Sequence, residues 1–89
     1  MVRSFIRHHV SDYAAWREVY DSFGDAQREH GVRAEAVHRG VDDPNDVTVT
    51  HDFDDAEAAK AFFALQELKE AMQRSGVEGE PAFWLAAEA

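Results

Sequence analysis

The order of strand-like and helix-like segments limits the fold of this chain more than any other feature of its sequence. Alternating apolar residues predict strands over residues 2–10, 32–41, 47–53 and 81–89. A helical stretch lies between the first and second of these strands, and another between the third and fourth. The order strand–helix–strand, given twice, is the split βαβ arrangement of ferredoxin-like folds. We therefore predict one α+β domain over residues 1–89, with a four-stranded antiparallel sheet and both helices on one face.

The chain is short and rich in apolar residues, which favours oligomerisation. A domain of 89 residues buries only about 60–65% of its unfolded surface, so its core is thin. Hydrophobic residues nevertheless make up 45% of the sequence, and ten residues are aromatic. This is more apolar surface than one small core uses. Since the helices leave one face of the sheet uncovered, we predict a homodimer that packs through this face.

The net charge of −9 argues against nucleic acid and anionic membrane surfaces as partners. The charge is also uneven: residues 1–41 carry six Arg against six acids, and residues 42–89 carry three basic residues against twelve acids. The ordinary interpretation is a solubilising acidic surface. The alternative is that the Arg residues of the first part gather around an anionic or oxygen-rich ligand.

The chain has no cysteine, which excludes disulfides and thiolate chemistry. Its N-terminal sequence has no apolar region of the kind found in signal peptides. No apolar run approaches the length of a membrane span. We therefore expect a cytoplasmic protein.

Each helical stretch carries one apolar stripe and has recognisable ends. The stripe of the first stretch consists of Tyr13, Trp16, Tyr20 and Phe23. Ser11 suits the N-cap, and Gly31 suits a helix end in the left-handed conformation. Gly24 lies inside this stretch and is expected to loosen or bend it.

The second stretch shows the same signals. Its stripe consists of Ala58, Phe62, Leu65, Leu68 and Met72. Asp54 or Asp55 is expected to cap its start, and Gly76 to end it. Pro81 is then expected to open the last strand, because a residue without an N–H is tolerated at that position.

The second and third predicted strands are joined by the acidic segment DDPND, residues 42–46. Pro44 fixes φ, and the neighbouring Asp and Asn side chains bond to nearby backbone, so this segment predicts a turn between antiparallel strands. A five-residue connection leaves the register open by one residue. The register decides whether His38 or Arg39 shares a face of the sheet with His51.

Several of these features occur together, and in order, in a known group of proteins. They are Asp12-Tyr13, Trp16, Gly31, His38-Arg39, Asp42-Asp43-Pro44, Asp54-Asp55, Leu68, Met72, Gly76-Val77 and Pro81. With them the chain, over nearly its whole length, resembles the small dimeric α+β barrel proteins near the antibiotic-biosynthesis-monooxygenase group and its cyclase-like relatives. The resemblance implies a homodimer in which two sheets face each other as a barrel, with the helices outside. It also implies a cavity between sheet and helices for an aromatic or polyketide-like molecule, often used without metal or flavin.

Two features depart from this group of proteins. The Asn, Trp and His set of the haem-degrading branch does not map onto this chain, whose only asparagine is Asn45 in the turn. No catalytic residue is therefore carried over from that branch. Leu65 stands where these proteins often have a small polar residue, which leaves the position of a break in the second helical stretch open.

The five histidines are the first candidates for chemistry, because histidine exchanges protons readily near neutral pH. His8 and His9 are adjacent on a strand, point to opposite faces and cannot bind one metal together. His8, His38 and His51 lie on three predicted strands and could converge as a three-histidine metal site, but no ligand spacing supports it and we predict no metal. We favour one or two of these three histidines lining the cavity as a base or hydrogen-bond donor. The ordinary alternative is a strand histidine bonded to neighbours or water.

The candidates for ligand binding are His8, Tyr13, Trp16, Phe62, Met72 and Trp84. An aromatic stripe at helical spacing is most often core, yet two Trp and two Tyr in so small a domain are costly to bury because each has a polar atom. Arg39 is the preferred charged candidate, because it could pair with a carboxylate or enolate of the ligand. The alternative for Arg39 is a salt bridge to a nearby acid.

The resemblance thus implies, as the leading hypothesis, a cofactor-independent, monooxygenase- or cyclase-like enzyme for an aromatic or polyketide-like substrate. In this hypothesis His51 or His38 moves a proton and Arg39 steadies negative charge, and no cofactor is expected. One alternative is a non-catalytic small-ligand-binding or accessory homodimer with the same cavity. A further alternative is a dimerisation module whose cavity is filled by its own side chains.

Overall fold

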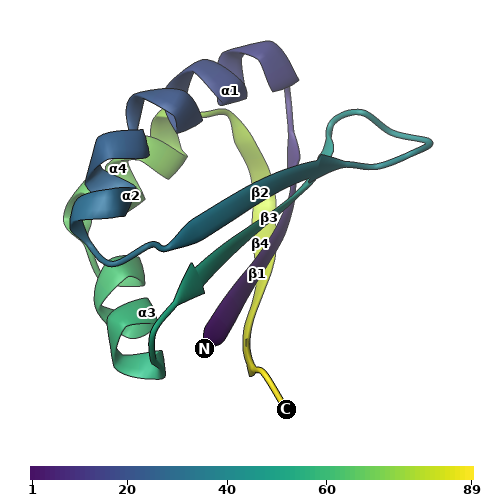
Figure 1. Cartoon of the computed structure of the whole chain (residues 1–89). Coiled ribbons are helices and arrows are strands. Elements are labelled where there is room, and N and C mark those ends of the chain that lie inside the picture. The colour runs from purple at the N-terminus through teal and green to yellow at the C-terminus, as the bar shows by residue number, and fades with distance from the viewer.

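The structure, a computed structural model, describes all residues from 1 to 89. Strands and helices follow one another in the predicted order, with each helical stretch divided in two. In chain order the elements are β1 (Val2–Val10), α1 (Tyr13–Ser22), α2 (Gly24–Glu29), β2 (Ala34–Arg39), β3 (Asp46–Phe53), α3 (Ala56–Phe63), α4 (Gln66–Arg74) and β4 (Val77–Ala87). Figure 1 shows a curved sheet with all of the helices on one side, and the β2–β3 connection extending away from the body.

The strands form one sheet in the order β2-β3-β1-β4, and every neighbouring pair is antiparallel. This order confirms the ferredoxin-like α+β fold. The register places Ser4 of β1 opposite His51 of β3, and Glu35 of β2 opposite the same His51. Since alternate residues share a face, Arg39 lies on the helix-covered face together with His51, and His38 lies on the open face.

Three of the four strands have boundaries that differ from the predictions. β2 spans Ala34–Arg39 rather than 32–41, and β3 begins at Asp46 rather than at residue 47. β4 spans Val77–Ala87 rather than 81–89. The expectation that Pro81 opens the last strand is wrong. β4 is an edge strand, and its register against β1 shifts between Arg7 and His9, so Pro81 lies at an irregularity where no ladder hydrogen bond is required of it.

A polar residue caps the start of the first helical stretch, and a glycine follows its end. Asp12, not Ser11 as predicted, caps α1: its carboxylate accepts the backbone N–H of the first turn at 2.9 Å. The stretch is interrupted at Phe23, directly before Gly24, which explains the division into α1 and α2. Gly31 has φ +94, the left-handed conformation predicted for it.

The second helical stretch is also interrupted. Asp55 caps α3, its carboxylate accepting the Ala58 N–H at 2.8 Å. Leu65 is extended, with φ −64 and ψ 131, and therefore separates α3 from α4. Gly76 follows α4 with φ +80, and a Cβ atom there would lie 2.8 Å from the hydroxyl oxygen of Ser11. This position thus requires glycine for both conformation and space.

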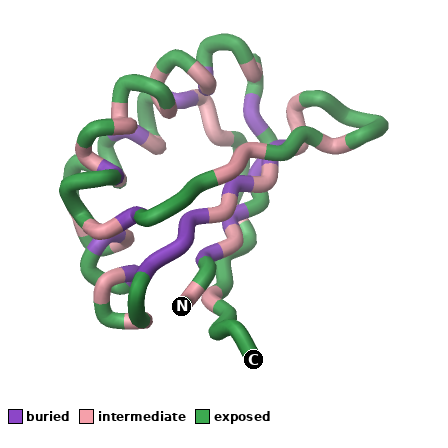
Figure 2. The backbone as a smooth tube through the Cα atoms, in the orientation of Figure 1, coloured by how far each residue is buried: buried purple, intermediate pink, exposed green.

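The core consists of two apolar clusters between the sheet and the helices. One contains Val10, Trp16, Val47 and Val49. The other contains Val32, Phe53, Ala59 and Phe62. Full burial of each large apolar side chain stabilises the fold by about 1.5–3 kcal/mol. In Figure 2 the buried segments concentrate on the central strands, and β2 is mostly exposed. No helix has both the length and the apolar character that crossing a membrane would take.

Candidate functional site

A small cavity lies between the sheet and helices α1, α2 and α4, where the two core clusters meet. Its volume is about 50 Å³, and ten of its fourteen lining residues are hydrophobic. This volume admits a few water molecules, whereas sites for small organic ligands measure about 300–1,000 Å³. An aromatic ligand would therefore have to displace some of the lining side chains.

His51 is the central polar residue of this cavity. The side chain projects from β3 and is only 4% exposed. Its Nδ1 lies 3.5 Å from the hydroxyl oxygen of Ser4, and its Nε2 is buried without a hydrogen-bond partner. Burial lowers the pKa of His51 to about 4, against smaller opposing effects of Glu35 and Asp52. The imidazole is therefore neutral near neutral pH.

His8 is the second buried imidazole of the cavity. It projects from β1, is 7% exposed, and neither of its ring nitrogens has a hydrogen-bond partner. Burial lowers its pKa, and the charge of Asp46 opposes this only in part. Ser4 of β1 lies opposite His51 of β3, and His8 follows Ser4 by four residues on β1. The two histidines are therefore attached roughly 13 Å apart along the strand direction. They thus mark two separate positions in the cavity.

Buried polar atoms without partners are rare, because each one costs about 1–3 kcal/mol. Three such atoms lie here on two histidines that line the same apolar cavity. A ligand that donates or accepts hydrogen bonds at these positions would satisfy them. An apolar cavity with a few convergent polar groups of shifted pKa is the usual form of a binding or active site.

Tyr20 forms part of the cavity wall and connects it to the edge of the sheet. Its ring stacks on Trp16 at 5.0 Å between centroids and lies 6.3 Å from the ring of His51. Its hydroxyl donates a hydrogen bond to the carboxylate of Glu35 on β2. Burial, helped by this bond, raises the pKa of Tyr20, so the hydroxyl keeps its proton.

The structure brings four of the sequence-predicted residues into this cavity: His8, His51, Trp16 and Met72. His38 is not among them, because it pairs with Thr48 on the opposite face of the sheet. The register therefore prevents the three-histidine convergence considered above. No cluster of three or more His, Asp and Glu side chains has metal-binding geometry.

Trp84 lies on the open face of the sheet, outside the cavity. Its ring stacks on Phe5 at 5.2 Å with an interplanar angle of 7°, and the residue is 48% exposed. Phe62, which is 1% exposed, packs against the ring of His51 at 5.5 Å but is not part of the cavity lining. It supports the site from the core.

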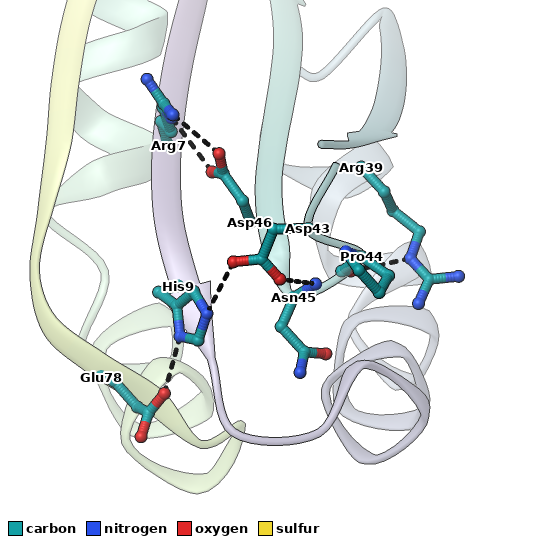
Figure 3. Close-up of polar contacts among 8 residues, drawn as sticks. All are labelled: Arg7, His9, Arg39, Asp43, Pro44, Asn45, Asp46 and Glu78. Atoms are coloured by element: carbon teal, nitrogen blue, oxygen red, sulfur yellow. Dashed lines mark hydrogen bonds and ion pairs between the residues drawn. The ribbon is translucent and has the colours of Figure 1, made fainter. Parts of the chain in front are cut away.

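Arg39 and Tyr13 also lie outside the cavity lining, and they contact each other. The Arg39 guanidinium is 3.8 Å from the centroid of the Tyr13 ring, a cation–π contact. Arg39 also donates a hydrogen bond to the carbonyl of Pro44 at 2.8 Å, which holds it at the β2–β3 connection (Figure 3). The same figure shows His9 bonded to Asp43 at 3.1 Å and to Glu78 at 2.7 Å. Arg39 is thus engaged with its own loop rather than with the histidines of the cavity.

Sequence reasoning missed several residues of the site, namely Ser4, Tyr20, Gln27, Glu35 and Phe63. Helical spacing assigns Tyr20 only to an apolar stripe. A signal for Ser4 was present, because alternation on the first strand puts it on the same face as His8. The contribution of Glu35 depends on the β2–β3 register, which the sequence left open.

The fold and cavity define a ferredoxin-like α+β protein with a buried site between sheet and helices. A crystal structure of an antibiotic biosynthesis monooxygenase is similar with a TM-score of 0.80 and 12% identity, covering 100% of this chain and 99% of the other. SnoaB, a cofactor-independent oxygenase from Streptomyces nogalater, is similar with a TM-score of 0.84 and 14% identity, covering 99% and 92%. A conserved protein from Methanosarcina mazei Go1 has a TM-score of 0.84 and 12% identity, covering 99% and 92%.

At these identities the likeness shows the fold. The chain has the architecture of structures described as antibiotic biosynthesis monooxygenases, as the sequence resemblance implied. No protein-family model matches the sequence, and no curated protein is similar to it.

Proposed function

We propose that this protein is a cofactor-independent, monooxygenase- or cyclase-like enzyme that acts on an aromatic or polyketide-like molecule between sheet and helices. The observation that carries the proposal is the pair of buried, unpartnered imidazoles, His8 and His51, in an otherwise apolar cavity. The likeness in fold to a cofactor-independent oxygenase supports it as an analogy.

His51 is the proposed proton acceptor. Its Nε2 is buried in the cavity, unpartnered and unprotonated near neutral pH, as a general base must be. A proton taken from an activated CH2 group leaves a carbanion, and this negative charge raises the pKa of the adjacent imidazolium. In an oxygenase reaction the carbanion reduces O2, and overall one CH2 group and one O2 give a carbonyl group and water. In a cyclase reaction the same carbanion attacks a carbonyl carbon of the substrate.

His8 is the proposed second anchor. Its distance from His51 along the strands suits an elongated, planar molecule with a polar group near each end. The ring of Trp16, 5.7 Å from that of His8, offers an aromatic surface beside this anchor. Arg39 and His38 have no part in this proposal, because neither lines the cavity.

One observation favours the alternative of a non-catalytic binding or accessory protein. None of the cavity-lining residues is Lys or Arg, so no fixed cation is available to balance a carbanion or an enolate. A protein that only binds a neutral phenol or ketone through its two imidazoles needs no such cation.

Oxygen consumption with dithranol separates these functions. Dithranol is a tricyclic phenol with an activated CH2 group. We expect the protein to accelerate its oxidation, the variant His51→Leu to lose the acceleration, and the matched variant His38→Leu on the open face to keep it. Binding without turnover would support the accessory role. Full activity in His51→Leu would contradict the assignment of the base.

We also propose that the protein is a homodimer joined through the open faces of two sheets. The stacked Phe5–Trp84 pair, with Trp84 half exposed, supplies apolar contact area on this face. Arg3–Asp52 and Arg7–Asp46 ion pairs lie beside it, at 2.6 and 2.7 Å. We expect light scattering after gel filtration to give a dimer mass, and Trp84→Glu to give a folded monomer. A monomeric wild-type protein would refute this assembly.

A further inference from the structure

A second, larger hollow lies next to the cavity of the two histidines, on the outer side of Tyr20. It is a groove of about 420 Å³ between the α1–α2 segment and β2, and its rim carries Asp21, Arg28, Arg33 and Glu35. The groove has a mostly polar lining, whereas the cavity has a mostly apolar one. It is thus the part of this face where a small molecule has room to lie outside the core.

The groove and the cavity share two lining residues, Tyr20 and Gln27. These two side chains therefore form a partition with the cavity on one side and the groove on the other. Gln27 is 5% exposed, and Tyr20 is half-buried. Without the partition, the joined volume falls within the range of ordinary small-molecule sites, which the cavity alone does not reach.

Tyr20 is the movable part of this partition. Its hydroxyl is held by one hydrogen bond to Glu35, an exposed residue on the edge strand β2. Tyr20 belongs to the last turn of α1, and the helix is interrupted at Phe23, immediately before Gly24. Once this bond opens, the ring is held by its stacking contacts with Trp16 and His51 and by a cation–π contact with Arg17 at 5.4 Å.

We propose that Tyr20 is a gate between the groove and His51: the Tyr20–Glu35 bond holds the ring in the partition, and ligands reach His51 from the groove when the bond opens. This inference rests on the proposed function for the identity of the site, but the gate itself is a property of the free protein. It explains how a cavity of about 50 Å³ can receive an aromatic molecule.

Chemical labelling of histidines tests the gate without any substrate. Diethyl pyrocarbonate reacts with accessible neutral imidazoles, and mass spectrometry of peptides reads each histidine separately. In the wild-type protein His51 should react far more slowly than the exposed His30, which lies at the end of α2 and outside the proposed dimer face. Tyr20→Phe keeps the ring and removes the bond, and we expect it to raise the His51 rate about tenfold or more, the factor that corresponds to a lost hydrogen bond to a charged group. Tyr13→Phe is the control, since it removes a hydroxyl from the same helix outside both hollows.

Three results would overturn the gate: His51 reacting as fast as His30 in the wild-type protein, an unchanged rate in Tyr20→Phe, or acceleration by Met72→Ala alone. The last result would place the entrance on the α4 side. Circular dichroism of each variant ensures that a faster rate does not come from unfolding. If dithranol is not oxidised but the labelling result holds, the proposed activity fails and the gate stands.

Discussion

The pKa of His51 predicts how the stability of the fold depends on pH. A histidine in an unfolded chain has a pKa near 6.5, whereas burial lowers that of His51 to about 4. Between these two values the unfolded chain binds a proton that the folded chain does not bind. The contribution of His51 to the free energy of unfolding is therefore fully present above about pH 6.5, and it is lost progressively as the pH falls towards 4.

The size of this effect follows from the two pKa values. The full shift corresponds to about 3 kcal/mol, and the part lost between pH 7 and pH 5 is about 2 kcal/mol. His8 acts in the same direction, because burial lowers its pKa as well. His9 acts in the opposite direction, because Glu78 and Asp43 raise its pKa. A comparison of wild-type protein with a variant that lacks only His51 isolates the contribution of that residue.

The test is urea denaturation at pH 7 and pH 5, followed by tryptophan fluorescence, at one fixed protein concentration. His51→Leu removes the titrating group and keeps an apolar side chain of similar size. We expect the wild-type protein to lose about 2 kcal/mol more than the variant on going from pH 7 to pH 5. The carboxylates of Asp46, Asp52 and Asp54 do not disturb this window, since their lowered pKa values place their contribution below it. Equal losses in both proteins would refute a desolvated imidazole in this cavity.

Three further predictions concern stability, each measured by urea denaturation against wild type. Trp16→Ala should cost about 3–5 kcal/mol, because the indole is 4% exposed and lies in the first core cluster; a smaller loss would mean that it is only a cavity wall. Asp55→Ala should cost about 1 kcal/mol through loss of the α3 cap, and an unchanged midpoint would contradict that role. Gly76→Ala should destabilise by about 1–3 kcal/mol, because φ is +80 and the added Cβ would meet Ser11. Gly24→Ala is its control and should be neutral or slightly stabilising, because φ is ordinary there and the added Cβ would meet only the Arg28 side chain at 3.8 Å.

Much of the fold could be predicted because the local signals agree with each other. The boundaries of β1 follow its alternation without error, and Gly31 and Gly76 adopt the left-handed conformations expected of helix ends. The wrong predictions of element boundaries lie where contacts between residues distant in the sequence determine the structure. The local sequence predicts that a strand starts at Pro81. The structure instead places Pro81 inside β4, where a proline is tolerated because β4 is an edge strand with a register shift against β1.

The candidate site was less predictable, because it depends on register and depth rather than on residue type. His38 and His51 look alike in the sequence, yet pairing of His38 with Thr48 puts the two on opposite faces of the sheet. Trp84 is apolar and regularly spaced, but it belongs to the open face. Arg39 lies on the same face of the sheet as His51, but it contacts the carbonyl of Pro44 and the ring of Tyr13 instead of the cavity. Neither strand alternation nor helical spacing carries this information.

Long-range proton–nitrogen NMR of the histidine rings, with and without dithranol, tests the central claim most directly. The account predicts that without ligand the His51 ring is neutral near pH 7, and that dithranol shifts its Nε2 resonance strongly. The resonances of His38, on the other face of the sheet, should not move. A protonated His51 at neutral pH, or a ligand-induced shift at His38 with none at His51, would contradict a small-molecule site between sheet and helices.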